Sequence, residues 1–207
     1  MTENRSPLLD SVAVTRHDTA VGRLSLAASD DALLYCGFAP VDVAQRLLSR
    51  VARHCTDDPS TIRPGRRAVL EQAQAEIDAY LAGERRTFSV PLDPRLASDF
   101  TREVLRAVDG QVGYGRTSTY AQIAAAIGRP GAARAVGVAL GSNPLCLVLP
   151  CHRVIGAHGR LTGYAGGIPA KQFLLDLEAR PSASVAAERR WEKARKSTGP
   201  SMPAGGN

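Results

Sequence analysis

Three short apolar runs occupy the first forty positions of the chain and alternate with polar turn residues. They cover residues 12–15, 24–28 and 33–38, and Gly22 and the cluster at residues 29–31 lie between them. Runs of this length bounded by turn residues are typical of β-strands. The pattern therefore predicts three strands, mostly antiparallel, at the N-terminal end.

Beyond residue 40 the apolar positions recur every three to four residues, which is the period of a helix. Residues 43–51 carry one such stripe, and residues 69–81 carry a second that Gly83 ends. Residues 88–90 predict one further short strand. We therefore expect residues 1–95 to form a small α/β domain, with helices packed on its strands.

The next part of the chain predicts three helices. The first covers residues 98–109, with Ser98 as its cap. Thr119 and Gln122 form a T-x-x-Q capping box, which starts the second helix. A tight turn follows, and then a third helix over residues 132–140. Two short helices joined by a glycine-bearing turn indicate a helix-turn-helix.

Five glycines between positions 154 and 167, with short apolar pieces between them, predict a hairpin that would form a wing. Pro169 suits the first turn of a last helix, which ends at Glu178. Residues 98–180 thus predict a winged helix-turn-helix domain, and the fold class is α+β. Residues 181–207 are rich in Ser, Ala, Gly and charge, and predict a disordered basic tail.

Charge is unevenly distributed along the chain. Residues 1–97 carry a net charge of −1, residues 98–180 carry +4 and residues 181–207 carry +3. A basic C-terminal half indicates a face that binds a polyanion, although an ordinary solvated surface explains the charge equally well. The sequence has no run of 18 apolar residues, no signal-peptide core and no CxxC pair. We therefore expect a cytoplasmic protein with reduced thiols and no membrane association.

The pair Cys151-His152 is the strongest candidate for chemistry. Only the thiolate of a cysteine is nucleophilic, and a neighbouring imidazole either accepts the thiol proton or stabilises the thiolate. Taken alone, a Cys-His pair is more often a buried structural cysteine beside a surface histidine. The motifs on both sides decide between the two interpretations.

Five motifs surround this pair in a fixed order. They are Tyr114-Gly115-Arg116-Thr117-Ser118-Thr119-Tyr120, Ala132-Ala133-Arg134-Ala135-Val136-Gly137, Gly141-Ser142-Asn143-Pro144, Pro150-Cys151-His152-Arg153-Val154 and Gly163-Tyr164-Ala165-Gly166-Gly167. In this order and spacing they resemble the O6-alkylguanine-DNA alkyltransferases, closely over about 80 residues and more weakly over the preceding 90 or so. The resemblance implies an N-terminal domain of ribonuclease-H-like topology and a winged helix-turn-helix that carries the active site.

The resemblance also implies a reaction. In this family a cysteine, here Cys151, takes the alkyl group from O6 of guanine in duplex DNA, and O4-alkylthymine is a further expected substrate. Each molecule reacts once and needs no cofactor or metal. His152 would act on the thiol through a bridging water, Glu178 would orient the imidazole, and the Tyr120 phenol would donate a hydrogen bond to the leaving guanine.

The helix at 132–140 offers almost no side chains that read base edges, which fits the minor groove better than the major groove. A buried Ala-rich helix is the plain alternative. The resemblance implies that Arg134 enters the duplex in place of an extruded base, while small residues let the helix approach the groove. These are Ala133, Ala135 and Gly137. Thr101 and Arg129 would contact phosphates, and the expected partner of the monomeric protein is double-stranded DNA with an alkylated guanine.

Other matched positions have pocket-lining or structural roles by resemblance. Asn143 would tie the turn that leads into an apolar strand at 145–149 and so to Cys151, and Arg153 would support the fold. The remaining members of this set are Leu140, Val154, Tyr164 and Ala165. Two positions depart from some family members, since Ala165 stands in place of a serine and Cys146 in place of a proline. We interpret Cys146 as a buried small residue rather than a second nucleophile.

Three other functions compete with alkyl transfer as interpretations of the sequence. A lesion-binding relative without transfer activity would lack Cys151. A regulator with a redox-sensing thiol would carry base-reading side chains on the 132–140 helix, and a cysteine hydrolase would show an Asp or Asn partner. The remaining candidates for a metal site are His17, Cys36, His54 and Cys55. Their spacing matches no zinc pattern, so no metal is expected.

Overall fold

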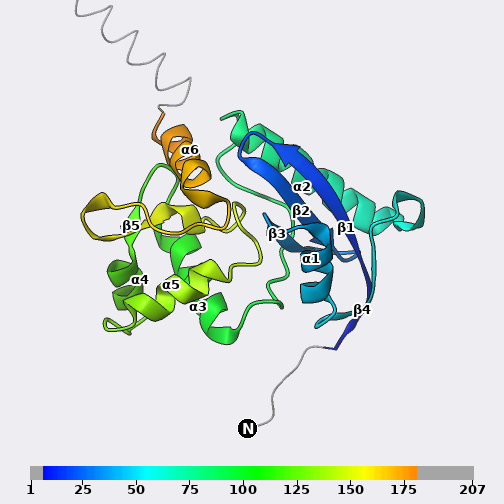
Figure 1. The fold of residues 1–207 in the computed structure, drawn as a ribbon, viewed down its shortest axis with the longest axis horizontal. Coiled ribbons are helices and arrows are strands. Elements are labelled where there is room, and N and C mark those ends of the chain that lie inside the picture. Colours follow the sequence, from blue (N-terminus) through cyan, green and yellow to red (C-terminus); the bar gives the residue numbers. More distant parts are fainter. Residues whose placement is uncertain (1–6, 181–207) are drawn as a thin grey trace, which may run out of the picture.

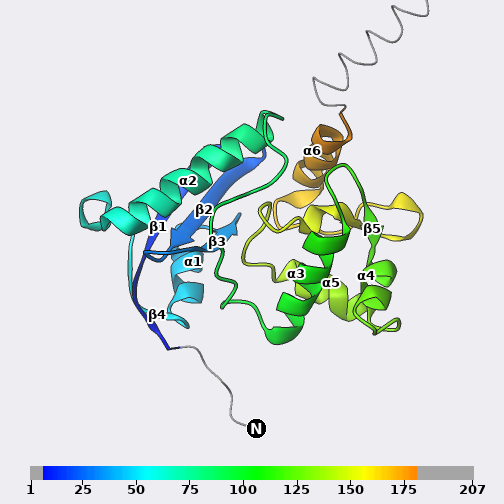
Figure 2. The same cartoon turned by 180° about the vertical axis from the view of Figure 1, so that it is seen from behind.

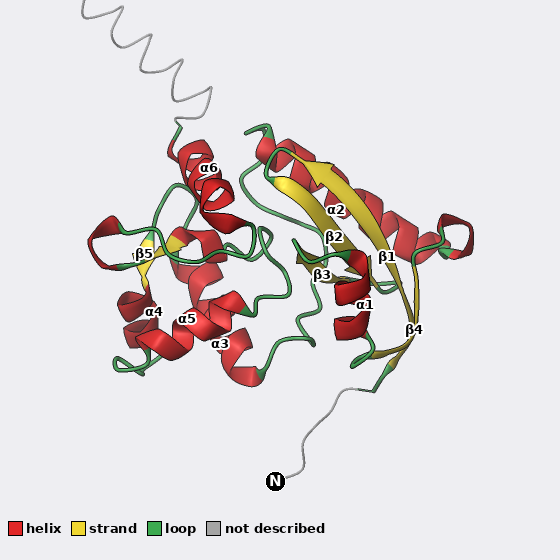
Figure 3. Cartoon of the chain, viewed as in Figure 1, coloured by secondary structure: helices red, strands yellow, loops and turns green. Residues whose placement is uncertain are grey.

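The computed structural model describes residues 7–180, and it contains two lobes that lie side by side (Figure 1). The N-terminal lobe is a sheet with helices packed on it, and the C-terminal lobe is mostly helical (Figure 3). The predicted tail at 181–207 lies outside the described residues. In the described part, no helix combines the length and the apolar character needed to cross a membrane.

The sheet has four strands in the order β3-β2-β1-β4. The strands are β1 (Leu9–Thr19), β2 (Gly22–Ala28), β3 (Leu33–Gly37) and β4 (Ala52–Thr56). The first three are antiparallel, as predicted, and β4 runs parallel to β1. The β1–β2 turn closes with Thr19 opposite Gly22, whose φ of 116° favours glycine over any residue with a Cβ.

Each face of the sheet packs on one helix because successive strand residues point to opposite sides. Val12 and Val14 share a core with α1 (Val41–Leu48). Ala13, between them, belongs to the core of α2 (Pro64–Leu81). Viewed from behind, α2 lies along β1 and β2 (Figure 2).

One prediction for the N-terminal lobe was wrong, because residues 88–90 form no strand. Strand β4 was not predicted at all. The backbone N–H groups of Ser89 and Val90 donate to the Glu76 carboxylate at 2.7 and 3.2 Å, so they are not available to a neighbouring strand. Leu92, just beyond, makes an isolated bridge to Leu33.

Four α-helices of the described residues build the C-terminal lobe, and the first two start at the predicted caps. They are α3 (Asp99–Gln111), α4 (Tyr120–Ala126), α5 (Ala133–Gly141) and α6 (Gly167–Ala179). The Ser98 side chain accepts from the Thr101 backbone N–H. Both bonds of the capping box form, because Thr119 accepts from the Gln122 N–H at 3.2 Å and donates its own N–H to the Gln122 side chain at 2.7 Å.

The segment predicted as a wing, residues 154–167, does not form the predicted hairpin. Residues 154–167 contain β6 (Val154–Ile155), which pairs in parallel with β5 (Ser118–Thr119), the strand directly before α4. After β6 the chain folds back through a single 3-10 turn, closed by the Gly156 N–H on the Arg160 carbonyl at 2.8 Å. The glycines therefore make a compact loop rather than two paired strands.

The apolar run at 145–149 is not a strand either. It is a buried turn in which Leu147 takes a φ of 73°, which is uncommon for a bulky residue. Leu145, Leu147 and Val148 join the core formed by α2 and the sheet. The Cys36 N–H donates to the Pro144 carbonyl at 2.8 Å, so the turn is fastened to the edge strand β3. One core thus crosses from one lobe to the other.

Candidate active site

Cys151 begins a short 3-10 turn, Cys151–Arg153, directly after the buried turn at 145–149. Its backbone N–H donates to the Leu149 carbonyl at 2.8 Å, and 5% of the residue is exposed. Cys151 lines a pocket of about 360 Å³, a size usual for small-molecule sites. The other residues that line it are Tyr120, Gly137, Leu140, Gly141, Gly163, Tyr164 and Ala165.

Asn143 ties the turn that carries the thiol. Its side-chain oxygen accepts from the Leu145 N–H at 2.9 Å, and its side-chain nitrogen donates to the Leu149 carbonyl at 3.0 Å. These two bonds span the buried turn and hold its ends together. The structural role expected for Asn143 has a direct geometric basis.

The surroundings of Cys151 favour the thiolate. The neighbouring Cys146 side chain lowers the pKa of the Cys151 thiol, while burial opposes the shift. The Asn143 side chain and the positive charge of Lys171 lower this pKa further. The pKa of Cys146 itself rises well above its usual value, so Cys146 keeps its proton. Cys146 is buried, as expected, and its S–H donates to the Asn143 carbonyl at 3.4 Å.

His152, Arg153 and Glu178 form a buried cluster behind the thiol. His152 Nε2 lies 2.9 Å from Glu178 Oε1, and the Arg153 guanidinium donates to both carboxylate oxygens at 2.9 to 3.1 Å. The Gly115 N–H also donates to Glu178, at 2.9 Å. Glu178 is therefore a fully engaged internal carboxylate, and not the solvated helix-end residue that its sequence position favours.

The cluster holds a charged carboxylate against a neutral imidazole. Burial raises the pKa of Glu178, but hydrogen bonds from His152 and Arg153 outweigh it and bring the pKa to about 2. Burial lowers the pKa of His152 below its usual value, against the attraction of Glu178. Among the described residues, Nδ1 of His152 has no hydrogen-bond partner. A neutral imidazole with a free nitrogen is able to accept a proton.

Tyr120 is the first residue of α4 and faces the same pocket as Cys151. Its hydroxyl lies 2.7 Å from Thr162 Oγ1, so the phenol is held in place and can donate or accept. Ala165 also lines the pocket, and the Tyr164 hydroxyl is buried without a partner among the described residues. Val154 is buried, and its carbonyl accepts from Lys171 at 2.6 Å.

Helix α5 has one buried side and one exposed side. Val136, Ala139 and Leu140 pack inward. Arg134 and Ala135 are exposed, while Ala133 and Gly137 are half-buried. Since Gly137, Leu140 and Gly141 also line the pocket, the exposed side of α5 continues into its rim. The plain alternative, a buried Ala-rich helix with Arg134 on its rim, does not fit, because Ala135 and Val138 are exposed as well.

Thr101 and Arg129 make contacts within the protein. Thr101 is buried, and its hydroxyl accepts from Ser98 at 2.9 Å. Arg129 lies 3.1 Å from Glu103 and 5.1 Å above the Phe100 ring. Their phosphate contacts stay predictions.

Two family descriptions match the chain. Residues 99–180 match the model of the 6-O-methylguanine DNA methyltransferase DNA-binding domain, and residues 13–94 match that of its ribonuclease-like domain. The chain belongs to the 6-O-methylguanine DNA methyltransferase family. DNA repair by alkyl transfer to a cysteine of the protein itself is the activity of this family, and it is stoichiometric. The resemblance drawn from the five motifs is confirmed.

The relatives of this methyltransferase are similar to it in sequence and structure along most of its length. The methylated-DNA–protein-cysteine methyltransferase of Mycolicibacterium paratuberculosis is 43% identical over 171 residues, which are 80% of this chain and 91% of the relative. The crystal structure of Mycobacterium tuberculosis O6-methylguanine methyltransferase is 37% identical, with a TM-score of 0.68, and the match covers 85% of this chain and 99% of that one. A structure of Mycobacterium tuberculosis OGT in complex with DNA is 38% identical, with a TM-score of 0.64, over 82% and 92% of the two chains.

Sequence reasoning missed three residues of the methyltransferase site. Lys171 is almost fully buried and sends its ammonium to the Val154 carbonyl. A lysine between the apolar residues of α6 was the available signal. Thr162 holds Tyr120, and no pattern marks it. Tyr80 comes from the N-terminal lobe, where helical periodicity identifies it only as a core residue.

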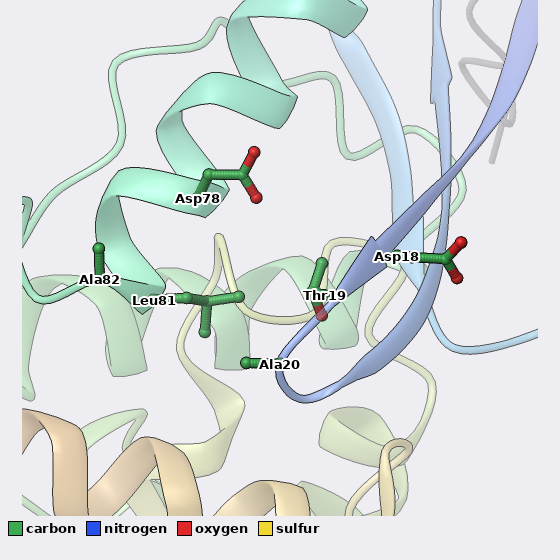
Figure 4. Close-up of a pocket in the computed structure, with 6 residues that line it drawn as sticks. All are labelled: Asp18, Thr19, Ala20, Asp78, Leu81 and Ala82. Carbon is green, nitrogen blue, oxygen red and sulfur yellow. The ribbon is translucent and has the colours of Figure 1, made fainter.

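The other candidates do not gather into a second centre. His17 lies 2.7 Å from Asp78, and residues 7–180 contain no group of three or more His, Cys, Asp or Glu side chains placed to hold a metal ion. A surface hollow lies between the β1–β2 turn and the end of α2 (Figure 4). The residues that line it are Asp18, Thr19, Ala20, Asp78, Leu81 and Ala82, none of which lines the Cys151 pocket.

Proposed function

We propose that Cys151 is the residue that receives the alkyl group, from O6 of guanine in duplex DNA and also from O4 of alkylated thymine. The supporting observation is a thiol of lowered pKa in a pocket whose lining includes a phenol. The Cys151 sulfur attacks the alkyl carbon in line, a C–S bond forms and the C–O bond breaks. The electron pair leaves with the base oxygen. The thioether that forms on Cys151 is stable, so each protein molecule reacts only once.

The roles of the neighbouring residues follow from which of them can accept or donate a proton. His152 takes the thiol proton on its free Nδ1, through a bridging water, and Glu178 stabilises the imidazolium that results. Tyr120 donates a hydrogen bond to the base as negative charge develops on the base. Asn143 holds the turn that carries the sulfur, and both Asn143 and Cys146 favour its thiolate form. No cofactor is required for this sequence of steps.

The DNA contact is assigned to the exposed side of α5. A helix surface of alanine and glycine lets the backbone approach a narrow groove closely. Arg134 projects from this surface, and we assign it the space left when the target base rotates out of the stack. The charge of +4 on residues 98–180 suits a polyanion. We propose that the protein works as a monomer in the cytoplasm, where its thiols stay reduced.

The decisive experiment is a mass measurement. The purified protein is incubated with a duplex that carries one O6-methylguanine, and the intact protein and its peptides are weighed. We expect a gain of one methylene unit on Cys151 that saturates at one per molecule. An unchanged mass with the lesion still bound would instead support a lesion-binding protein without transfer activity.

Replacing Arg134 with alanine tests the role of α5. Extruding a base costs a few kcal/mol, part of which a stacked guanidinium offsets. We therefore expect single-turnover repair in duplex DNA to slow by about 10- to 100-fold. Reaction with the free modified base should change by less than about twofold, since no base is extruded there. An equal fall in both rates would contradict the assignment. Arg50→Ala, which changes an exposed arginine of the N-terminal lobe, is the matched control and should repair duplex DNA like the wild type.

A further inference from the structure

Tyr80 of the N-terminal lobe reaches into the active-site cluster of the C-terminal lobe. It lies near the end of α2, and its side chain is fully buried. Its hydroxyl contacts Glu178 Oε1 and lies 3.3 Å from His152 Nε2. The ring packs against Phe88 and Tyr114, at centroid distances of 5.1 and 6.1 Å. The phenol therefore touches both members of the pair that serves the nucleophile.

The hydrogens in this cluster have only one consistent arrangement. Glu178 is ionised and can only accept, so the single Tyr80 hydroxyl hydrogen points at the carboxylate. Toward His152 the phenol then offers a lone pair. Nε2 of His152 faces this lone pair and the Glu178 oxygen, two acceptors, and must carry a proton itself. The proton-accepting nitrogen of the imidazole is then Nδ1, which has no partner among the described residues.

We propose that Tyr80 is a positioning residue for alkyl transfer, which together with Glu178 holds His152 in the tautomer with a protonated Nε2 and a free Nδ1. This inference rests on the proposed function of Cys151 and His152, and extends it to a residue of the other domain. Through Tyr80, the ribonuclease-like domain takes part in preparing the nucleophile without touching substrate.

The charged groups around His152 fix the direction of the effect. They are the Glu178 carboxylate and two cations, Arg153 and Lys171. In Tyr80→Phe the carboxylate loses one donor, so its remaining charge attracts the imidazole proton more strongly, and the pKa of His152 rises. Since His152 must be neutral to accept the thiol proton, the acidic limb of the rate profile moves to higher pH. We expect a shift of roughly half a unit to one unit.

Tyr80→Phe keeps the ring and its packing, and removes only the hydroxyl. The single-turnover rate on O6-methylguanine duplex is measured between about pH 5 and pH 9 for the full-length wild type, for Tyr80→Phe and for Ser25→Ala. Ser25→Ala is matched because it also loses one buried hydroxyl, which donates to the Ala39 carbonyl at 2.7 Å within the N-terminal lobe. We expect a displaced acidic limb for Tyr80→Phe alone. Coincident profiles, or an equal fall in rate at every pH, would overturn the inference.

A spectroscopic measurement separates this inference from the proposed function. Nitrogen-15 spectra of labelled histidines report the tautomer of His152 without any substrate, and they need only the wild-type protein. We expect His152 in the form protonated at Nε2. A proton on Nδ1 would overturn the inference even if alkyl transfer is intact. If the wild type fails to transfer the alkyl group, the proposed function is wrong, and the spectrum still reports the tautomer independently.

Discussion

Replacing Cys151 with alanine is expected to abolish alkyl transfer and to leave the affinity for duplex DNA within about twofold of wild type. Among residues 7–180, the thiol is the only nucleophile of lowered pKa that lines the pocket, so no other described side chain can take over the displacement. The residue is small and almost fully buried, and it lies outside the exposed side of α5, so DNA contacts stay intact. Transfer is measured by the intact mass after incubation with lesion-bearing duplex, and binding by titration of labelled DNA.

A second cysteine provides the control for this experiment. Cys55 lies on β4, half-buried, and burial raises the pKa of its thiol to about 11. Cys55→Ala should therefore transfer one alkyl group per molecule, like the wild type. Alkylation that persists in Cys151→Ala, on any residue and in a DNA-dependent manner, would disprove the assignment of the nucleophile.

Glu178→Gln is expected to destabilise the fold by about 3–5 kcal/mol at neutral pH, because it leaves the buried Arg153 guanidinium without its counter-charge. Urea unfolding at pH 7 measures the difference. Glu103→Gln is the matched control, since the Glu103–Arg129 pair is partly exposed and should contribute less than about 1 kcal/mol. Equal losses of unfolding free energy in the two variants would contradict the conclusion that the buried cluster stabilises the fold more than the exposed pair does.

The stability difference between wild type and Glu178→Gln is also expected to depend on pH. The pKa of Glu178 in the folded protein is about 2, below its ordinary value of 4.5. A carboxyl with a depressed folded pKa contributes its full stability above the unfolded pKa, and loses it as pH falls from there toward the folded value. The gap between wild type and Glu178→Gln should therefore narrow between about pH 4.5 and pH 2. A gap that stays constant through this window would contradict the assigned shift.

The features that the sequence predicted correctly are those that depend on residues close together in the chain. The capping box at Thr119 and Gln122, the helical stripe on α2 and the Cys-His pair each depend on residues near one another in the chain, and each has its predicted form or place. Strand β4 escaped detection because only its first residue is buried, so its alternation of polar and apolar residues is weak.

The errors and omissions arise from contacts between distant segments. The glycines after Val154 satisfy the composition of a hairpin, but β6 finds its partner in β5, about 36 residues earlier in the chain. Tyr80 reads as an ordinary core residue of α2, and only the folded chain brings it to Glu178, 98 positions away. Periodicity identifies buried positions, but it does not say which hydroxyl meets which carboxylate.

The turn at 145–149 inserts its leucines into the core of the N-terminal lobe, where Leu174 and Leu177 of α6 join them. Separation of the lobes would expose this apolar surface to water at a cost of about 25 cal/mol for every Å² uncovered. Although the family is described by two sequence domains, we therefore expect the protein to unfold as one cooperative unit, and we expect a fragment made of either half alone to aggregate.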